Sequence, residues 1–398
     1  MLSYGAAARG AVAGCCARAE RTPIAATGTT NAAPTSSTNP LLSTGPSLPQ
    51  TATVCQIGTG ASRAGVAAVL VAMPESLAAA IERGDVDDLI RLVDALCEAR
   101  EWDRLVELRD RCEQAVARGR QLWPVAAHAE YRLALEAPGR FAATVLVEGA
   151  GRFAPGPLPE VAASTHEWAD LAPHAPPGPA AVLAAHERVL RGEDLTGETL
   201  PGPPVLDLPL RLAGWEPEYL LAHYRPDGVD LPGPQPPALT SIEVPSRSLH
   251  GNHDPATHAL LDAVRAWTEG SEGRAEATTV RGDALAAITA LGRDRVRMAE
   301  LSAPAGLCAL AWAGASGGAH ARRPGAAAGR FTAWWAGAAL TGLLEEWPVD
   351  AATLGDALTR LRWYAWDSGG TATGWRLHLA IEDPTSGRSW AVAAVDNA

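Results

Sequence analysis

The sequence predicts a mainly α protein with a C-terminal α+β unit, in which a helical-hairpin or solenoid-like array is followed by helices packed on a small antiparallel sheet. Three observations predict this class. Apolar residues recur at helical spacing from residue 85 onward. More than half of the 31 prolines lie between residues 155 and 237. The last quarter of the chain alternates apolar and polar residues as antiparallel strands do.

The first 72 residues differ from the rest of the chain. They contain one acidic residue, Glu20, and many Ala, Thr, Ser, Gly and Pro without apolar periodicity, which is typical of disorder. "VAGC" at 12–15 resembles a lipoprotein cleavage box, but Arg9 interrupts the apolar run that such a signal needs. We interpret 1–72 as a disordered leader or a start codon assigned too far upstream, with Met73 as the alternative initiator.

The first structured unit is expected to be helical and to span 73–230. Asp85 is placed to cap a helix whose apolar positions form one stripe: Val86, Leu89, Ile90, Val93, Leu96 and Cys97. Further helices are expected from about Glu101, from Trp123 until Pro138, and over 182–190. A φ-D-x-L-φ-x-L pattern occurs twice, at 86–92 and 102–108, and indicates a helical-hairpin repeat.

Proline marks the boundary between the two units. The run "LPGPQPP" at 231–237 is incompatible with a helix or a central strand, so we expect extended connections and a hinge or linker over 231–248. An α/β unit then spans 249–398.

Within the α/β unit we expect helices over 255–270 and 283–292 and strands over 275–280 and 295–301. The segments "LRWYAWD", "GWRLHLAIED" and "RSWAVAAVD" predict a three-stranded antiparallel meander. A helix from about Ala326 to Glu345 is the expected cover of one face of the sheet. Eight of the 13 tryptophans lie in the last quarter of the chain, which predicts an aromatic-rich core, with a ligand cleft or partner surface as the alternative.

The segment "SGGAHARRPGAAAGR" at 316–330, hereafter the Gly/His/Arg loop, has two interpretations. In the first it binds a phosphate or carboxylate: the glycines admit an anion to backbone N–H groups, a helix starts near Gly325, the arginines clamp the ligand and the histidine acts as acid or base. The residues of this candidate site are Gly317, Gly318, His320, Arg322, Arg323 and Arg330. In the second, favoured interpretation the glycines end one helix, Pro324 starts the next, and 326–329 allow two helices to pack closely.

Two other segments look like catalytic motifs but lack the context that those motifs need. "GNHD" at 251–254 resembles a metallophosphoesterase fragment, but no DxH or GDxxD stands upstream, and Asp254 before Pro255 is explained as a helix N-cap. "WDSGG" at 366–370 and "VAAHA" at 125–129 resemble segments of chymotrypsin-like proteases, but His128 lies in a helical run and the fold would require two β-barrels. We therefore predict no catalytic residue and no metal site.

The segment that starts "LCALAWAGASGGAHARRPG", together with the Trp-rich hairpin after it, resembles the C-terminal part of an uncharacterised actinobacterial family of unknown function. "AEYRLALEAPGRFA" and "LPEVAASTHEWADL" resemble its helical part. The similarity covers most of 73–398 and implies no activity. All 33 basic residues are arginine, which fits the GC-rich genome of such an organism.

Composition limits the remaining classes of function. A net charge of −12 argues against a nucleic-acid or anionic-membrane partner, and no apolar run is long enough to span a membrane. The six cysteines lack metal or disulfide spacing, so we expect reduced thiols in a cytoplasmic protein without a cofactor. The sequence favours a non-enzymatic interaction or scaffold protein with a protein partner. The alternative is an enzyme or small-anion binder that uses the Gly/His/Arg loop.

Overall fold

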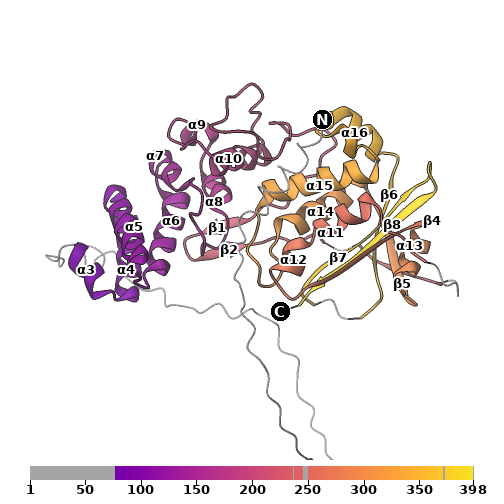
Figure 1. Ribbon diagram of the computed structural model, residues 1–398, viewed down its shortest axis with the longest axis horizontal. Helices are drawn as coiled ribbons and strands as arrows, with labels where there is room; N and C mark the ends of the chain where they lie inside the picture. The colour runs from indigo at the N-terminus through magenta and orange to yellow at the C-terminus, as the bar shows by residue number, and fades with distance from the viewer. Residues whose placement is uncertain (1–76, 236, 245–249, 371–372, 398) are drawn as a thin grey trace, which may run out of the picture. The chain divides into compact units, whose positions relative to one another are not determined.

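The computed structural model describes residues 77–235, 237–244, 250–370 and 373–397 (Figure 1). These residues belong to one compact unit. The predicted class, mainly α with a C-terminal α+β part, is confirmed. The predicted leader and Met73 lie outside the described residues. No helix in the described ranges is long and apolar enough to cross a membrane.

The helical array begins where the apolar stripe predicts it. Asp85 caps the second helix by accepting the backbone N–H of Asp88 at 3.1 Å. The α4, α5 and α6 helices pack on one another, and α6 continues the array through α8 to α10. The elements are α3 (Leu77–Arg83), α4 (Val86–Ala99), α5 (Trp102–Ala117), α6 (Trp123–Glu136), α7 (Gly139–Ala142), η1 (Ala143–Val145), α8 (Leu158–Thr165), α9 (Trp168–Leu171) and α10 (Pro179–Leu190).

The proline-rich segment after α10 consists mainly of turns, bends and irregular backbone. It contains a short hairpin of β1 (His223–Arg225) and β2 (Gly228–Asp230). Farther on, β3 (Thr240–Ile242) pairs with β5 at the edge of the large sheet, although the sequence indicates only a hinge or linker there. A three-residue strand next to prolines carries too little periodicity to be recognised from the sequence.

The sheet is antiparallel and larger than the predicted meander. Its order is β3-β5-β6-β7-β8-β4, with β4 (Arg274–Arg281), β5 (Val296–Leu301), β6 (Arg362–Asp367), β7 (Trp375–Asp383) and β8 (Arg388–Asp396). The meander β6-β7-β8 and both predicted separate strands are confirmed. The distant segment β4 pairs with β8 along its whole length, a long-range contact that local pattern does not reveal.

Helices cover both faces of the sheet. One face packs on α11 (Pro255–Asp262) and α14 (Ala303–Ala315), and the other packs on α13 (Ala284–Ala290) (Figure 1). The expected cover, α15 (Ala326–Leu340), instead lies on α11 and α14 as an outer layer. The reason is composition: α14 is apolar around its whole circumference, so it is stable only when both of its sides are buried.

Several helices end earlier than the sequence predicts. The α15 helix stops at Leu340 rather than near Glu345, because Gly342 adopts a left-handed φ of 78°. The backbone N–H of Leu343 then donates to the backbone oxygen of Ala338 and closes the helix end. A short 3-10 turn, η2 (Leu344–Glu346), and α16 (Ala351–Leu358) follow it. The predicted helix over 255–270 is divided into α11 and α12 (Arg265–Glu269).

One core cluster joins the end of α10 and the proline-rich segment after it to the sheet layer. Buried side chains of Leu190, Leu206, Leu208 and Tyr219 belong to the same cluster as Trp267, Trp334 and Trp363 of the C-terminal part. A smaller core around α13 fills the other face of the sheet. The apolar contact between the two parts is therefore continuous, and the division into domains at 231–248 stays a prediction.

Candidate functional site

The Gly/His/Arg loop connects α14 to α15, and its last five residues, 326–330, form the first turn of α15. The α14 helix ends at Ala315, and Gly318 turns the chain with a φ of 65°. The next backbone N–H, that of Ala319, donates to the buried carboxylate of Asp396 at 2.7 Å. Gly325, with a φ of 104°, is the N-cap of α15, so Pro324 lies just before the cap rather than inside the helix.

Arg323 of this loop is paired with a carboxylate of the helical array. Its Nε and Nη2 atoms donate to the two oxygens of Glu160 at 3.0 and 2.8 Å. The Glu160 side chain is completely buried, and the hydroxyl of Tyr224 donates to it as well, at 2.9 Å. Burial opposes the Arg323 charge, but the Glu160 carboxylate outweighs it and raises the pKa of Arg323 above its usual value.

The N-terminus of α15 receives a second carboxylate, that of Glu187 in α10. The Glu187 Oε1 atom accepts the backbone N–H of Ala327 at 2.7 Å, and Oε2 accepts Arg191 Nη1 at 2.9 Å. Burial raises the pKa of Glu187, and the neighbouring charge of Glu160 raises it further. The positive end of the helix therefore does meet an anion, but the anion is a side chain of the same chain.

Arg330 lies one turn into α15 in a separate buried cluster. Its guanidinium makes a bidentate pair with Glu216, with Nε to Oε2 at 2.7 Å and Nη2 to Oε1 at 2.8 Å, and both side chains are inaccessible to solvent. The same carboxylate accepts the Tyr219 hydroxyl and the Trp334 indole N–H. Burial alone would raise the pKa of Glu216, but the bonds and charge of Arg330 lower it below its usual value.

The remaining residues of the candidate site also lie apart. Arg322 donates through Nη2 to the backbone oxygen of Gly151 at 3.2 Å, and His320 is exposed. Gly317 is buried against the chain itself: a Cβ there would stand 1.9 Å from the backbone oxygen of Ala321. Two of the arginines, Arg323 and Arg330, thus have carboxylate partners inside the protein, and Arg322 bonds to a backbone oxygen.

The partners that sequence reasoning missed are the three glutamates 160, 187 and 216. One signal was available for two of them. Glu160 and Glu187 stand in "LPEVAAST" and "LAAHERVL", short helices in which most of the other positions are apolar. A carboxylate inside such a segment is buried and needs a cationic partner. Which arginine supplies that partner is decided by the tertiary structure.

An exposed aromatic patch, defined by Trp123 and Phe153, lies on the helical array. Their side chains are accessible to 41% and 53%, and their ring centroids lie 4.2 Å apart. The Arg152 guanidinium stands over Phe153, 5.5 Å from its centroid. The segment that carries Phe153 is anchored at Gly151, whose N–H donates to the buried Glu130 and whose oxygen accepts Arg322. The Gly/His/Arg loop therefore contacts the segment that carries Phe153.

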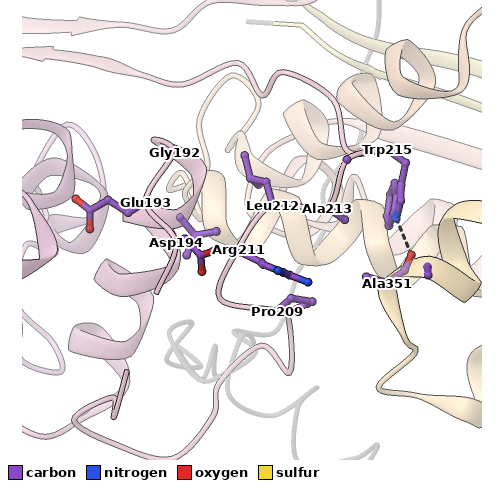
Figure 2. A pocket seen from close by; sticks show the side chains of 12 residues that line it. Gly192, Glu193, Asp194, Pro209, Arg211, Leu212, Ala213, Trp215 and Ala351 are labelled. Atoms are coloured by element: carbon purple, nitrogen blue, oxygen red, sulfur yellow. Dashed lines mark hydrogen bonds between the residues drawn. The ribbon is translucent and has the colours of Figure 1, made fainter. Parts of the chain in front are cut away.

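A cavity of about 640 Å³ lies beside the Arg330–Glu216 pair. Figure 2 shows its lining, with Glu193 and Asp194 at one end, Trp215 at the other, and Arg211 between them. The indole N–H of Trp215 donates to the backbone oxygen of Ala351 at 2.6 Å, which fixes the ring. Most of the lining is apolar.

The two segments that resemble catalytic motifs have structural roles. Asp254 caps α11, and its second oxygen accepts the indole N–H of Trp390 at 2.9 Å. Asp367 pairs with Arg297 and accepts the Gly369 N–H in a turn, while His128 lies in α6 bonded to Asp94. In the part of the chain that the structure describes, no three His, Cys, Asp or Glu side chains gather as metal ligands would.

Comparison with known proteins gives a family but no activity. No curated protein and no solved structure matches the chain. A family model matches residues 87–398, from the first turn of α4 to the end of the sheet, which is most of the chain. The chain therefore belongs to a family of unknown function (DUF6183).

Proposed function

We propose that this chain is a non-enzymatic interaction or scaffold protein that binds a protein partner through the aromatic patch. The observation that carries the proposal is the pair of half-exposed, contacting rings of Trp123 and Phe153, whose planes are tilted by 43°. Single exposed apolar side chains are common, but adjacent exposed aromatics with an arginine over one ring are typical of interface hot spots.

The anchoring of the patch supports the same proposal. A rigid aromatic surface loses little conformational entropy when a partner binds, so its apolar area is converted into affinity more fully. Buried bonds at Gly151 hold the segment on one side, and a Cβ at that position would stand 2.4 Å from the Leu158 side chain. The rings are therefore presented by a segment with little freedom to rearrange.

The rival function, an enzyme or anion binder in the Gly/His/Arg loop, has less support. An external anion at Arg323 or Arg330 would have to displace Glu160 or Glu216, each of which is buried and bidentate. Leaving such a carboxylate unpaired in the interior is strongly unfavourable.

The proposal is tested by capture and reconstitution. The purified full chain is used as bait in a lysate of its source organism, beside the Trp123→Gln, Phe153→Ser double variant and a Leu231→Ser control. Leu231 is also an exposed apolar residue but lies outside the patch. We expect a protein that wild type and control retain and the double variant loses, and calorimetry with the purified partner should give affinity at least about tenfold weaker for the double variant.

Two results would contradict the proposal. One is that no retained protein depends on the patch. The other is that phosphates or nucleotides raise the unfolding midpoint of the wild type, and that Arg322→Ala with Arg323→Ala abolishes this rise; the rival anion site would then be supported.

The proposal includes a cytoplasmic location in an actinobacterium, as the arginine-only composition and the cysteine spacing predict. The thiol chemistry is consistent with it. Cys97, Cys112 and Cys308 are free thiols, and burial raises the pKa of Cys97 to about 12 and that of Cys112 to about 11. Such thiols are unreactive, so the described cysteines indicate no redox function.

A further inference from the structure

The cavity beside Trp215 has a wall that is fixed from inside the protein. The buried guanidinium of Arg330 donates to the backbone oxygens of Pro209 and Arg211 at 2.9 and 2.8 Å, and its partner Glu216 accepts the backbone N–H of Ala213 at 2.8 Å. The residues of the wall are thus bonded to a rigid ion pair rather than to one another. A cavity built in this way exists before a ligand arrives, which lowers the entropic cost of binding.

The apolar end of the cavity is equally well defined. The Trp215 ring packs 4.9 Å from the Trp334 ring, and a Cβ at Gly355 would stand 2.2 Å from its Cδ1 atom, so the indole is closely packed on the side away from the cavity's open space. Leu212, which also lines the cavity, leaves 37% of its surface accessible. Rigid indole and exposed aliphatic surface together suit an apolar group of moderate size.

Charged groups of both signs lie next to this apolar surface. The Arg211 guanidinium lines the cavity, is exposed, and forms no hydrogen bond or ion pair with the described part of the chain. Asp194 stands near it: bonds from Thr196 and, in smaller part, the Arg211 charge lower the pKa of this carboxyl. Glu193 is already occupied, since it accepts the Trp168 N–H and pairs with Arg188.

We propose that this cavity binds a small zwitterion with an apolar body, of the chemical class of the apolar α-amino acids. Arg211 receives the carboxylate, Asp194 receives the ammonium group, and the side chain lies against Trp215 and Leu212. A simple anion would bring a second negative charge beside the Asp194 carboxylate, and a simple cation would leave the guanidinium without a partner. The volume of about 640 Å³ lies within the range of small-molecule sites.

The test compares one ligand with three derivatives that each remove a charge or the apolar body. Calorimetry and thermal unfolding of the full chain are carried out with phenylalanine, phenylalanine amide, N-acetylphenylalanine and glycine. We expect phenylalanine to bind and to raise the unfolding midpoint, and each derivative to bind at least about tenfold more weakly, because a charge-assisted bond or the apolar contact is lost.

Variants locate the site. Arg211→Gln and Asp194→Asn should each weaken phenylalanine binding about tenfold or more, and Leu212→Ser should weaken it less. Arg295→Gln, another exposed arginine outside the cavity, should have no effect. All four side chains are at the surface, so the variants are expected to fold, which the unfolding curves check. Absence of phenylalanine binding at millimolar concentration, equal binding of N-acetylphenylalanine, or unchanged binding in Arg211→Gln would overturn the proposal.

Discussion

At the scale of single residues, the arginines of the Gly/His/Arg loop show how one side chain type takes two different buried roles. Arg323 binds Glu160 of α8 at the contact between the helical array and the loop, whereas Arg330 binds Glu216 of the proline-rich segment after α10. Both pairs are bidentate and dehydrated. Buried pairs of this kind contribute little net stability, but they become very unfavourable when one partner is removed.

The Arg330–Glu216 pair allows a direct measurement. Glu216→Gln leaves the Arg330 charge buried without its counter-ion, so the free energy of unfolding should fall by about 3–5 kcal/mol in urea denaturation. Asp367→Asn is the matched control. It breaks a bidentate Arg–carboxylate pair whose Arg297 side chain is 43% exposed, and it should cost about 1 kcal/mol or less. Equal losses in both variants would show that the burial of the pair is not what matters.

His186 makes stability depend on pH. It is buried in α10, its Nδ1 atom has no hydrogen-bond partner among the described residues, and burial, followed by the charge of Arg330, lowers its pKa from 6.5 to about 4. A lowered pKa means that the unfolded state binds the proton first. The contribution of the neutral His186 side chain to the free energy of unfolding is therefore complete above pH 6.5. It is lost as the pH falls to about 4, and the loss amounts to about 3 kcal/mol.

We expect His186→Gln to reduce the acid destabilisation by this amount. Urea midpoints are compared across the pH window with those of the wild type, so that groups common to both proteins, including His378, cancel. His320→Gln, at an exposed position, serves as the control and should leave the pH dependence unchanged. An identical pH slope in wild type and His186→Gln would contradict the assignment.

At the scale of elements, the contact between α14 and α15 depends on small residues. The two helices approach so closely at Gly329 that a Cβ there would stand 2.2 Å from the backbone oxygen of Ala311. The composition of 326–329 predicts this close packing. What it does not predict is the layer order, in which α14 lies against the sheet and α15 lies outside it.

Gly329→Ala tests the close approach. A methyl group that meets backbone must push the helices apart, and the overpacking should lower the free energy of unfolding by about 1–3 kcal/mol despite the better helix propensity of alanine. The control is Gly214→Ala, where a Cβ meets no atom within 4 Å, and its effect should stay within about 0.5 kcal/mol. A stabilised Gly329→Ala variant would mean that the helices are less tightly packed than described.

At the scale of the whole molecule, the end of α10 and the proline-rich segment after it share a core with the sheet layer, and a buried ion pair joins α8 to the Gly/His/Arg loop. Leu190 and Tyr219 pack in the same cluster as Trp334 and Leu377, and Arg323 bonds Glu160 across the same contact. Neither part can lose this contact without exposing apolar surface and a charge. The parts should therefore unfold together.

We expect a single cooperative transition of the full chain in urea, with far-ultraviolet circular dichroism and tryptophan fluorescence giving the same midpoint. Tryptophans are present in both parts, for example Trp102 in α5 and Trp363 in β6, so fluorescence reports on both. Two separated transitions would contradict this expectation and would instead support independent domains divided at 231–248.

Periodicity and capping in the sequence predict the fold class and most of the longer elements. The apolar stripe of α4, the Asp85 and Asp254 caps and the β6-β7-β8 meander all follow from periodicity and capping chemistry, which act over a few residues. The glycines and small residues of the Gly/His/Arg loop likewise indicated a turn between closely packed helices.

Only the tertiary structure decided which charges meet. Arg323 and Glu160 are 163 positions apart, and the β4–β8 pairing joins segments separated by more than a hundred residues. Arginine in a glycine-rich loop looks the same in a sequence whether its partner is a ligand or a glutamate of the same chain. Coulombic and hydrogen-bond partners depend on distance in space, and that distance exists only once the core that joins the two parts has formed.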